Sequence, residues 1–163
     1  ALGDREALVI GDQRRTYADL EERANRLAHH LLGVGVEAGQ HVALYLENCP
    51  EYLEAMLACF KVRAVPINVN YRYVEDELRY LFDNADLKAL VHHRSFTPRI
   101  AAVKDEMPLL RHLVTIDDGS DEDFGALGAV DYEQALAAAR VVRHLEREVA
   151  PLASHVKDER RTT

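Results

Sequence analysis

The sequence predicts an α/β fold with a mostly parallel sheet and flanking helices. Short apolar segments of strand length alternate with longer segments whose apolar residues recur at helical spacing. The segments between successive strands are long enough for the helical crossovers that join parallel strands. The composition is that of an ordinary globular domain, with 48% hydrophobic and 29% charged residues.

The chain is expected to begin with a hairpin and a helix. Residues 7–11 and 13–17 flank a Gly11-Asp12 turn, and glycine tolerates the positive φ of such turns. Thr16, followed three positions later by Asp19, predicts a capping box at the start of the helix. The apolar face predicted for this helix comprises Leu20, Ala24, Leu27, Ala28, Leu31 and Leu32, with a Glu22–Arg26 pair on the wet side and an end at Gly33 and Gly35.

Strands and helices then alternate along the chain. We predict strands at residues 41–46, 64–69, 89–92 and 113–116, a helix beginning near Pro50, a helix that includes residues 74–85, and helices spanning 96–106 and 132–139. Residues 64–69 are mostly apolar, so we expect that strand to be covered on both faces. Asn48 is expected to cap the helix that begins near Pro50.

The next two helices have apolar stripes. The stripe predicted after Pro50 is Leu53, Met56, Leu57 and Phe60. The stripe predicted for the following helix is Val74, Leu78, Leu81, Phe82 and Ala85, with Glu75 paired to Arg79 outside. Residues 117–125, D-D-G-S-D-E-D-F-G, are expected to form a connecting loop.

Charge excludes one class of partner. The formal net charge is −8, with the acidic excess in residues 1–139, which disfavours nucleic acid because phosphate neutralisation dominates such binding. No apolar run approaches 18 residues and no basic-plus-apolar leader precedes the domain, so we expect no transmembrane segment and a cytoplasmic location. Cys49 and Cys59, the only cysteines, are expected to be free thiols in or near the core.

The sequence offers few candidates for a metal or nucleophile site. The histidines are His29, His30, His41, His92, His93, His112, His144 and His155, and no H-E-x-x-H or i,i+4 pair occurs among them. None of the serines, Ser95, Ser120 and Ser154, lies in a G-x-S-x-G context. The acidic residues of 117–125 fit neither register of an EF-hand loop. Residues 33–39 follow a helix instead of opening one, so we expect a turn there and not a phosphate loop.

The order of three segments indicates a family. These are residues 15–31 (R-T-Y-A-D-L-E-E-R-A-N-R-L-A-H-H-L), 41–61 (H-V-A-L-Y-L-E-N-C-P-E-Y-L-E-A-M-L-A-C-F-K) and 64–92, which begins A-V-P-I-N-V-N-Y-R-Y-V. Together they resemble the start of the large domain of adenylate-forming (AMP-binding) acyl-CoA synthetases, most of all the ligases for fatty-acyl or steroid side-chain carboxylates. The resemblance implies an N-terminal subdomain over residues 1–139.

Residues 140–163 depart from that pattern and are expected to form a divergent tail, partly helical or frayed. The resemblance implies that a strand and a Gly/Ser/Thr-rich phosphate loop ending in Lys-Gly should follow near here, and no such loop is present. We therefore assign no catalytic, cofactor-binding or metal-binding residue. The expectation is a truncated synthetase, from a truncated or frameshifted gene, that is inactive alone; ATP, Mg²⁺ and CoA would serve a complete relative.

Two positions have meaning only through the resemblance. The Asn68–Tyr73 segment follows a strand at the sheet end where α/β folds bind ligands. It is expected either to set the next helix or to line the acyl or nucleotide pocket of a complete enzyme. Arg63 stands where the family usually has glycine, and a left-handed backbone there would cost about 1 kcal/mol or more.

Two other classes of protein remain open. One is a non-enzymatic module that pairs with a full-length ligase, and the other is an unrelated small α/β ligand-binding domain. A partial sheet is also expected to leave an apolar edge or face uncovered, which would favour self-association or pairing with the missing half.

Overall fold

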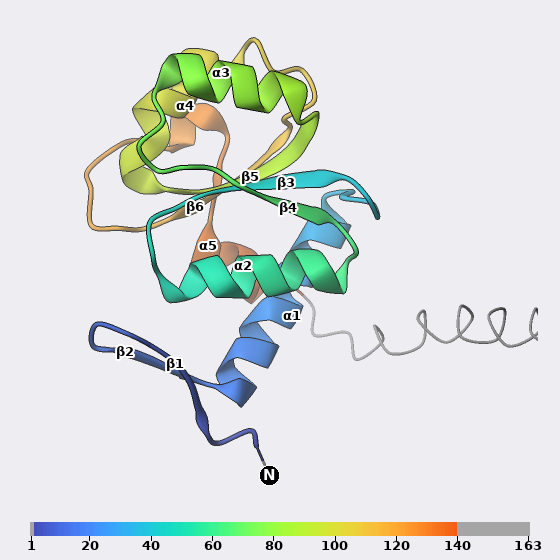
Figure 1. The fold of residues 1–163 in the computed structure, drawn as a ribbon, viewed down its shortest axis with the longest axis vertical. Coiled ribbons are helices and arrows are strands. Elements are labelled where there is room, and N and C mark those ends of the chain that lie inside the picture. The colour runs from blue at the N-terminus through green and yellow to red at the C-terminus, as the bar shows by residue number, and fades with distance from the viewer. Residues whose placement is uncertain (1, 140–163) are drawn as a thin grey trace, which may run out of the picture.

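The computed structural model describes residues 2–139, and the predicted tail, residues 140–163, lies outside the described residues. These residues form an α/β sandwich with a parallel sheet between two layers of helices (Figure 1). The elements are β1 (Glu6–Ile10), β2 (Gln13–Thr16), α1 (Tyr17–Gly33), β3 (His41–Tyr45), α2 (Pro50–Lys61), β4 (Val65–Asn68), α3 (Glu75–Asn84), β5 (Leu87–His93), η1 (Arg94–Phe96), α4 (Thr97–Lys104), β6 (His112–Ile116), η2 (Gly125–Leu127), β7 (Val130–Asp131) and α5 (Tyr132–Ala138).

The five-stranded sheet has the order β4-β3-β5-β6-β7, and every neighbouring pair in it is parallel. Helices α1, α2 and α5 cover one face, and α3 and α4 cover the other (Figure 1). Alternate residues of β3 face opposite layers: Val42 and Leu44 pack with α1, α2 and α5, whereas Ala43 and Tyr45 pack with α3 and α4. The predicted α/β class with a parallel sheet is confirmed.

The N-terminal hairpin and helix match their predictions. Strands β1 and β2 pair antiparallel around Gly11, whose φ is +56°. Thr16 and Asp19 form the predicted capping box: the Thr16 hydroxyl accepts the Asp19 N–H at 3.1 Å, and the Asp19 carboxylate accepts the Thr16 N–H at 2.8 Å. The Glu22–Arg26 pair also forms. One residue of the predicted apolar face differs, because Leu32 remains 43% exposed at the end of the helix.

The strand predicted at residues 64–69 is present as β4, but the prediction that both of its faces are covered was wrong. This strand is the edge of the sheet, hydrogen-bonded to β3 alone, and none of its four residues is buried. Its apolar composition indicated a covered strand, but the side of a strand that lacks a neighbour cannot be covered by the sheet. Pro66 lies in this strand, where an edge position tolerates its missing N–H.

Helix α2 also differs from its prediction. Its buried face consists of Glu54, Ala55, Ala58 and Cys59, whereas Phe60 is 57% exposed. The N-cap is Cys49, without a side-chain hydrogen bond, and not Asn48, although Pro50 does open the helix. In α3, Leu78 and Phe82 are buried as expected, but Val74 precedes the helix and is 43% exposed.

Arg79 on α3 contacts Asp76 and Glu106 at 2.8 Å each, and not the predicted partner Glu75. Within residues 2–139, no helix combines the length and apolar character needed to cross a bilayer.

Candidate functional site

The strand order identifies where a ligand would be expected. After β3 the chain passes through α2 on one face of the sheet, and after β5 it passes through α4 on the other face (Figure 1). The carboxyl ends of these two adjacent strands therefore form the topological switch point, where open α/β sheets bind ligands. The loops at this point are residues 46–49 after β3 and Arg94–Phe96 after β5.

Side chains of the domain itself fill this switch point. His93, at the end of β5, accepts the Glu47 N–H on Nδ1 at 3.1 Å and so links the two loops. The side chain is almost buried, and its ring packs 5.9 Å from that of Phe96. Burial lowers the pKa of His93, although Asp118, Glu47 and Glu51 oppose this effect. A neutral imidazole with Nδ1 as acceptor carries its proton on Nε2.

His92, the preceding residue, points to the opposite side of the strand. Its Nδ1 lies 2.9 Å from the His93 carbonyl oxygen, which can only accept, so Nδ1 carries the proton. Its Nε2 then accepts the Thr115 hydroxyl at 2.9 Å. Burial lowers the pKa of His92 to about 4, and the ring is therefore neutral at pH 7. Both ring nitrogens are used within the core, which indicates a structural role.

The loop after β4 is held by Tyr45 and Arg99. The Tyr45 hydroxyl donates to the Tyr73 carbonyl at 2.5 Å, and Arg99 Nη1 donates to the Tyr45 hydroxyl at 3.0 Å. The same nitrogen lies 3.1 Å and 3.2 Å from the carbonyls of Tyr71 and Tyr73. The rings of Tyr45 and Phe96 stack at 4.3 Å beneath it. This arrangement fixes the path of the chain from β4 into α3.

The Asn68–Tyr73 segment therefore has the structural role that was one of its two interpretations. The Asn70 side-chain oxygen accepts the Arg72 N–H at 3.0 Å. This bond stabilises a turn that leads toward α3. The Arg72 guanidinium lies 5.3 Å from the centre of the Tyr71 ring, and both side chains are exposed. Their participation in a substrate pocket remains a prediction.

A buried carboxylate that sequence reasoning missed links three helices and the hairpin. Glu54 of α2 has no exposed surface, and its Oε1 accepts Arg23 Nε at 2.9 Å and Arg15 Nε at 3.4 Å. Its Oε2 accepts the Tyr132 hydroxyl of α5 at 2.8 Å. Arg23 also contacts Glu133 through both terminal nitrogens, at 3.1 Å and 2.5 Å. Glu54 has no local sequence signal, because a single glutamate on a helix usually faces water.

The electrostatics of this cluster fit a structural role. Burial, reinforced by the charge of Glu54, raises the pKa of Tyr132 well above its usual value, so the phenol stays a donor. Burial alone would lower the pKa of Arg23, but Glu133 and Glu54 outweigh it and the pKa is raised. Each charge has a partner, as a buried ion pair requires.

The two loops considered as ligand sites are occupied by their own hydrogen bonds. In residues 33–39 the N–H groups of Val34, Gly35, Val36 and Gly39 donate to backbone carbonyls, which confirms a helix end and turn. In the acidic loop, Asp118 accepts the N–H groups of Ser95 and Ser120, and Asp117 and Asp123 accept those of Gly119 and Gly125. These carboxylates stabilise the turns of a connecting loop.

The remaining candidates are dispersed. Across the described part of the chain, no three side chains of His, Cys, Asp or Glu are grouped as metal ligands would be. Both cysteines are free, and burial raises the pKa of Cys49 and of Cys59 to about 12, so both are unreactive thiols at pH 7. His41 Nδ1 donates to the Ala85 carbonyl. His144, His155 and Ser154 lie outside the described residues.

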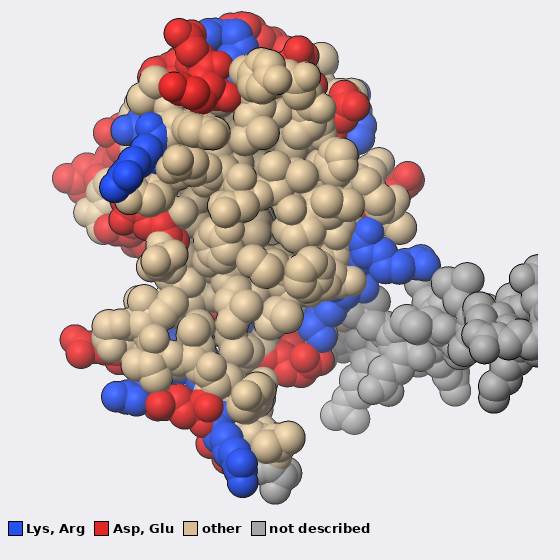
Figure 2. All heavy atoms as spheres, viewed as in Figure 1, with Lys and Arg blue, Asp and Glu red and all other residues tan. Residues whose placement is uncertain are grey.

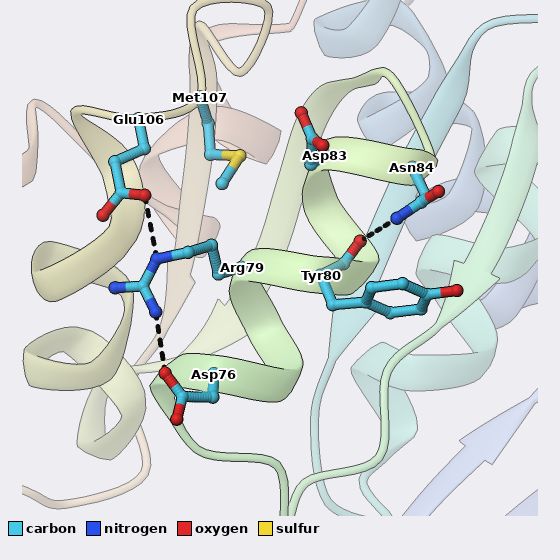
Figure 3. A pocket seen from close by; sticks show the side chains of 7 residues that line it. All are labelled: Asp76, Arg79, Tyr80, Asp83, Asn84, Glu106 and Met107. Atoms are coloured by element: carbon cyan, nitrogen blue, oxygen red, sulfur yellow. Dashed lines mark hydrogen bonds and ion pairs between the residues drawn. The ribbon is translucent and has the colours of Figure 1, made fainter.

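A surface hollow of about 450 Å³ lies elsewhere, between α3 and the residues that follow α4. Its lining comprises Asp76, Arg79, Tyr80, Asp83, Asn84, Glu106 and Met107. Figure 3 shows the Arg79 guanidinium held between Asp76 and Glu106 at one side of the hollow, with the Tyr80 ring directed away from it. The only cation in the lining is neutralised by these carboxylates, so the hollow is no anion site.

The geometry defines a class: a doubly wound α/β domain whose switch point is closed by its own residues. The protein is more closely defined by its relatives. The model of the AMP-binding enzyme family matches residues 1–155, and the chain belongs to that family. The match runs past Ala139, and the boundary predicted there stays a prediction.

Named relatives are CoA ligases. The chain is 50% identical over 143 residues to 3-oxocholest-4-en-26-oate–CoA ligase of Rhodococcus rhodochrous, a match that covers 88% of this chain and 26% of that protein. It is 49% identical to a medium/long-chain-fatty-acid–CoA/3-oxocholest-4-en-26-oate–CoA ligase of Mycobacterium tuberculosis, covering 85% of this chain and 25% of the relative. The chain thus spans about a quarter of the length of these relatives.

Solved structures agree on the fold. A putative long-chain-fatty-acid CoA ligase from Rhodopseudomonas palustris superposes with a TM-score of 0.71 at 28% identity, covering 81% of this chain and 32% of that one. An anthranilate CoA ligase in complex with anthranoyl-AMP superposes with a TM-score of 0.78 at 23% identity, covering 86% of this chain and 26% of that one. The first part of a CoA ligase is therefore the architecture that this chain shares.

Proposed function

We propose that this chain supplies the N-terminal part of the large domain of an acyl-CoA ligase that acts on a fatty-acid or steroid-type carboxylate. The observation that carries the proposal is 50% identity over 143 residues to a ligase of that class. In such a ligase the carboxylate reacts with ATP to give an acyl-adenylate and pyrophosphate, and the CoA thiol then takes the acyl group and releases AMP. Mg²⁺ would neutralise phosphate charge during the first step.

The domain itself would contribute to this chemistry by holding neighbouring elements of the ligase in position. In residues 2–139 the histidines at the end of β5 and Arg99 of α4 bond to the domain itself, which leaves positioning of neighbouring elements as their task. The groups that grip the nucleotide would come from the rest of the ligase. A cytoplasmic location fits the proposal, because ATP and CoA are supplied there and both cysteines are free thiols.

A chimera tests the proposal. In it, this chain replaces the matching 143-residue part of the Rhodococcus ligase. We expect the chimera to form acyl-CoA from a steroid side-chain or fatty acid, whereas the isolated 163-residue chain catalyses no ATP–pyrophosphate exchange. The Rhodococcus ligase without its matching part is the control. A folded chimera without turnover would contradict the proposal, and so would exchange by the isolated chain that substitutions within it abolish.

The alternative of a non-enzymatic partner for a full-length ligase has its own signature. It predicts that the isolated chain co-purifies with the intact Rhodococcus ligase and changes its activity, whereas the chimera is inactive. Turnover by the chimera, without binding of the chain to the intact ligase, favours the first proposal.

A further inference from the structure

We propose that His93 forms a proton-sensitive link between the two loops of the switch point: its neutral ring holds residues 46–49 against the end of β5, and its protonated ring releases them. The link, called here the His93–Glu47 link, is the hydrogen bond from the Glu47 N–H to His93 Nδ1 at 3.1 Å. The proposal goes beyond the proposed function and does not depend on it, because the link lies wholly within this chain.

The chemistry of the two partners makes the link incompatible with a proton on Nδ1. A backbone N–H can only donate, so His93 Nδ1 accepts it only while this nitrogen keeps its lone pair. A protonated imidazole carries a hydrogen on each ring nitrogen and accepts nothing. Protonation of His93 therefore places two donors opposite each other, and either the ring or residues 46–49 must move apart.

His92 shows that a buried histidine need not behave in this way. Its Nε2 faces the Thr115 hydroxyl at 2.9 Å, and a hydroxyl can rotate to accept as well as to donate. A second proton on His92 would therefore keep its hydrogen bonds. His92 also has no exposed surface, whereas His93 is 7% exposed, so a proton from solvent reaches His93 more readily. The link is thus sensitive to protons because its donor is a backbone amide.

Carboxylates from three other segments face the His93 ring. Glu47 lies on the loop after β3, Glu51 lies in the first turn of α2, and Asp118 lies on the loop after β6. Each of these charges raises the pKa of His93, against the larger effect of burial, which lowers it. After the link has opened, the same carboxylates would attract the protonated ring, which gives His93 a second favourable arrangement.

The surroundings of the link are mainly negative. Figure 2 shows acidic side chains gathered at the left of the view, where Figure 1 places the loop after β6 and the ends of β3 and β5. The nearby cations have partners of their own: Arg94 is paired with Asp117, and Arg99 of α4 donates to the loop after β4. His92 is neutral at pH 7. A positive charge on His93 is therefore compatible with the folded domain.

Opening of the link would free the loop that leads from β3 into α2. Within residues 2–139, no other side-chain hydrogen bond joins residues 46–49 to β5 or to the loops beside it. By contrast, the loop after β5 is also held to the loop after β6, because Asp118 accepts the Ser95 N–H at 3.1 Å. Release would therefore act on one loop, at the position where open α/β sheets bind ligands.

Hydrogen exchange of the Glu47 amide in the 163-residue chain tests the proposal. The titration midpoint of His93 is first measured from the NMR shifts of its ring protons. Protection of the Glu47 amide, relative to its intrinsic exchange rate, should fall about tenfold between one pH unit above and one below that midpoint, because the protonated fraction rises from about a tenth to about nine tenths. The Ala64 amide, which donates to the Cys59 carbonyl at 2.9 Å, is the internal control and should stay protected. Constant protection of Glu47 across the midpoint would overturn the proposal.

Two variants separate the link from general effects of acid. His93→Asn offers a side-chain oxygen as acceptor and cannot gain a proton, so the Glu47 amide should keep the same protection throughout this pH range. Glu47→Gln removes an exposed carboxylate and leaves the backbone N–H in place. Because the Glu47 charge raises the pKa of His93, its removal should move the midpoint and the loss of protection together to lower pH.

Glu37→Gln, at an exposed position in the turn before β3, is the matched control and should move neither the midpoint nor the protection. An unaltered loss of Glu47 protection in His93→Asn would overturn the proposal. So would a Glu47→Gln chain in which the midpoint of His93 moves and the loss of protection does not. All of these measurements use the chain alone, so their outcome is independent of turnover by the chimera.

Discussion

β4 and β5 are both short parallel strands beside β3, and both are rich in apolar side chains, yet their environments are opposite. In β5 every residue except Lys88 is buried, whereas in β4 none is. The composition of the two strands does not explain this difference. β5 lies between β3 and β6, whereas β4 has β3 alone. The number of neighbouring strands, and not the hydrophobicity of a strand, therefore determines how far it is buried.

The largest test of this comparison removes apolar volume from each strand. Leu90→Ala in β5 should lower the free energy of unfolding by about 3 to 4 kcal/mol, because the side chain is fully buried and leaves a cavity. Ile67→Ala in β4 should lower it by about 1 kcal/mol, since Ile67 is only partly buried. Urea unfolding of the isolated chain measures both. Equal losses would show that the two strands are packed alike.

The two sides of α2 extend the comparison to a helix. Glu54→Ala should destabilise the chain by about 2 to 3 kcal/mol, because Arg15 and Arg23 lose their buried partner. The loss is no larger because both arginines are partly exposed and remain partly hydrated. Phe60→Ala, on the exposed side, should change stability by about 0.5 kcal/mol or less. Chemical denaturation at neutral pH distinguishes them. A large loss at Phe60 would place that ring in the core.

The third test uses pH, because β5 carries two buried histidines, of which His92 has no exposed surface, and β4 carries none. The pKa of His92 is lowered by burial to about 4 in the folded chain. The unfolded chain binds this proton near pH 6.5, so the stabilisation is complete above that pH and is lost as pH falls toward 4.

Between pH 7 and 5 the contribution of His92 should be a loss of about 2 kcal/mol. His92→Gln should flatten the dependence of the unfolding free energy on pH in this window, whereas His29→Gln, on the partly exposed side of α1, should leave most of the slope in place. His30, His93 and His112, whose pKa values burial also lowers, keep a residual slope in either variant. An unchanged slope in His92→Gln would contradict the lowered pKa of the buried His92 side chain.

The smallest expected effect concerns the entrance to β4. Arg63 has a φ of +59°, which strains a residue with a side chain, and its carbonyl accepts the Gly39 N–H at 2.8 Å. Arg63→Gly should stabilise the chain by about 0.5 kcal/mol, since relief of strain exceeds the added entropy of the unfolded chain. Arg72→Gly, at a position without positive φ, should not stabilise. Thermal unfolding of both variants measures the difference.

Local patterns predicted the elements of the fold because their signals lie within a few residues. The Thr16–Asp19 capping box, the alternation of strands with helices, and the turn at residues 33–39 depend on neighbours in sequence. The strand order depends on distant pairings, so the strand at residues 64–69 was predicted but its exposure as an edge strand was not. The stripe of α2 was assigned to the core for the same reason, since periodicity identifies an apolar side without showing what covers it.

The candidate site was less predictable. The position of Asn68–Tyr73 at the end of a strand was visible in the sequence. Its attachment to Tyr45 and Arg99, however, joins residues that lie 26 to 28 positions apart. The bond between His93 and Glu47 likewise requires β3 and β5 to be neighbours. Glu54 could not be identified, because three of its contacts come from elements whose arrangement only the tertiary structure defines.

Pro66 has a consequence for biosynthesis. A ribosome makes the N-terminal quarter of a ligase first, and at about 5 to 20 residues per second the remainder follows only after tens of seconds. In the ligase proposed above, the newly folded portion would expose the edge strand β4 to other nascent chains during that interval. Pro66 has no N–H, so the outer side of β4 offers few donors for pairing with a second copy of the same strand. In the ligase proposed above, this would limit association between identical nascent chains until the remainder has been synthesised.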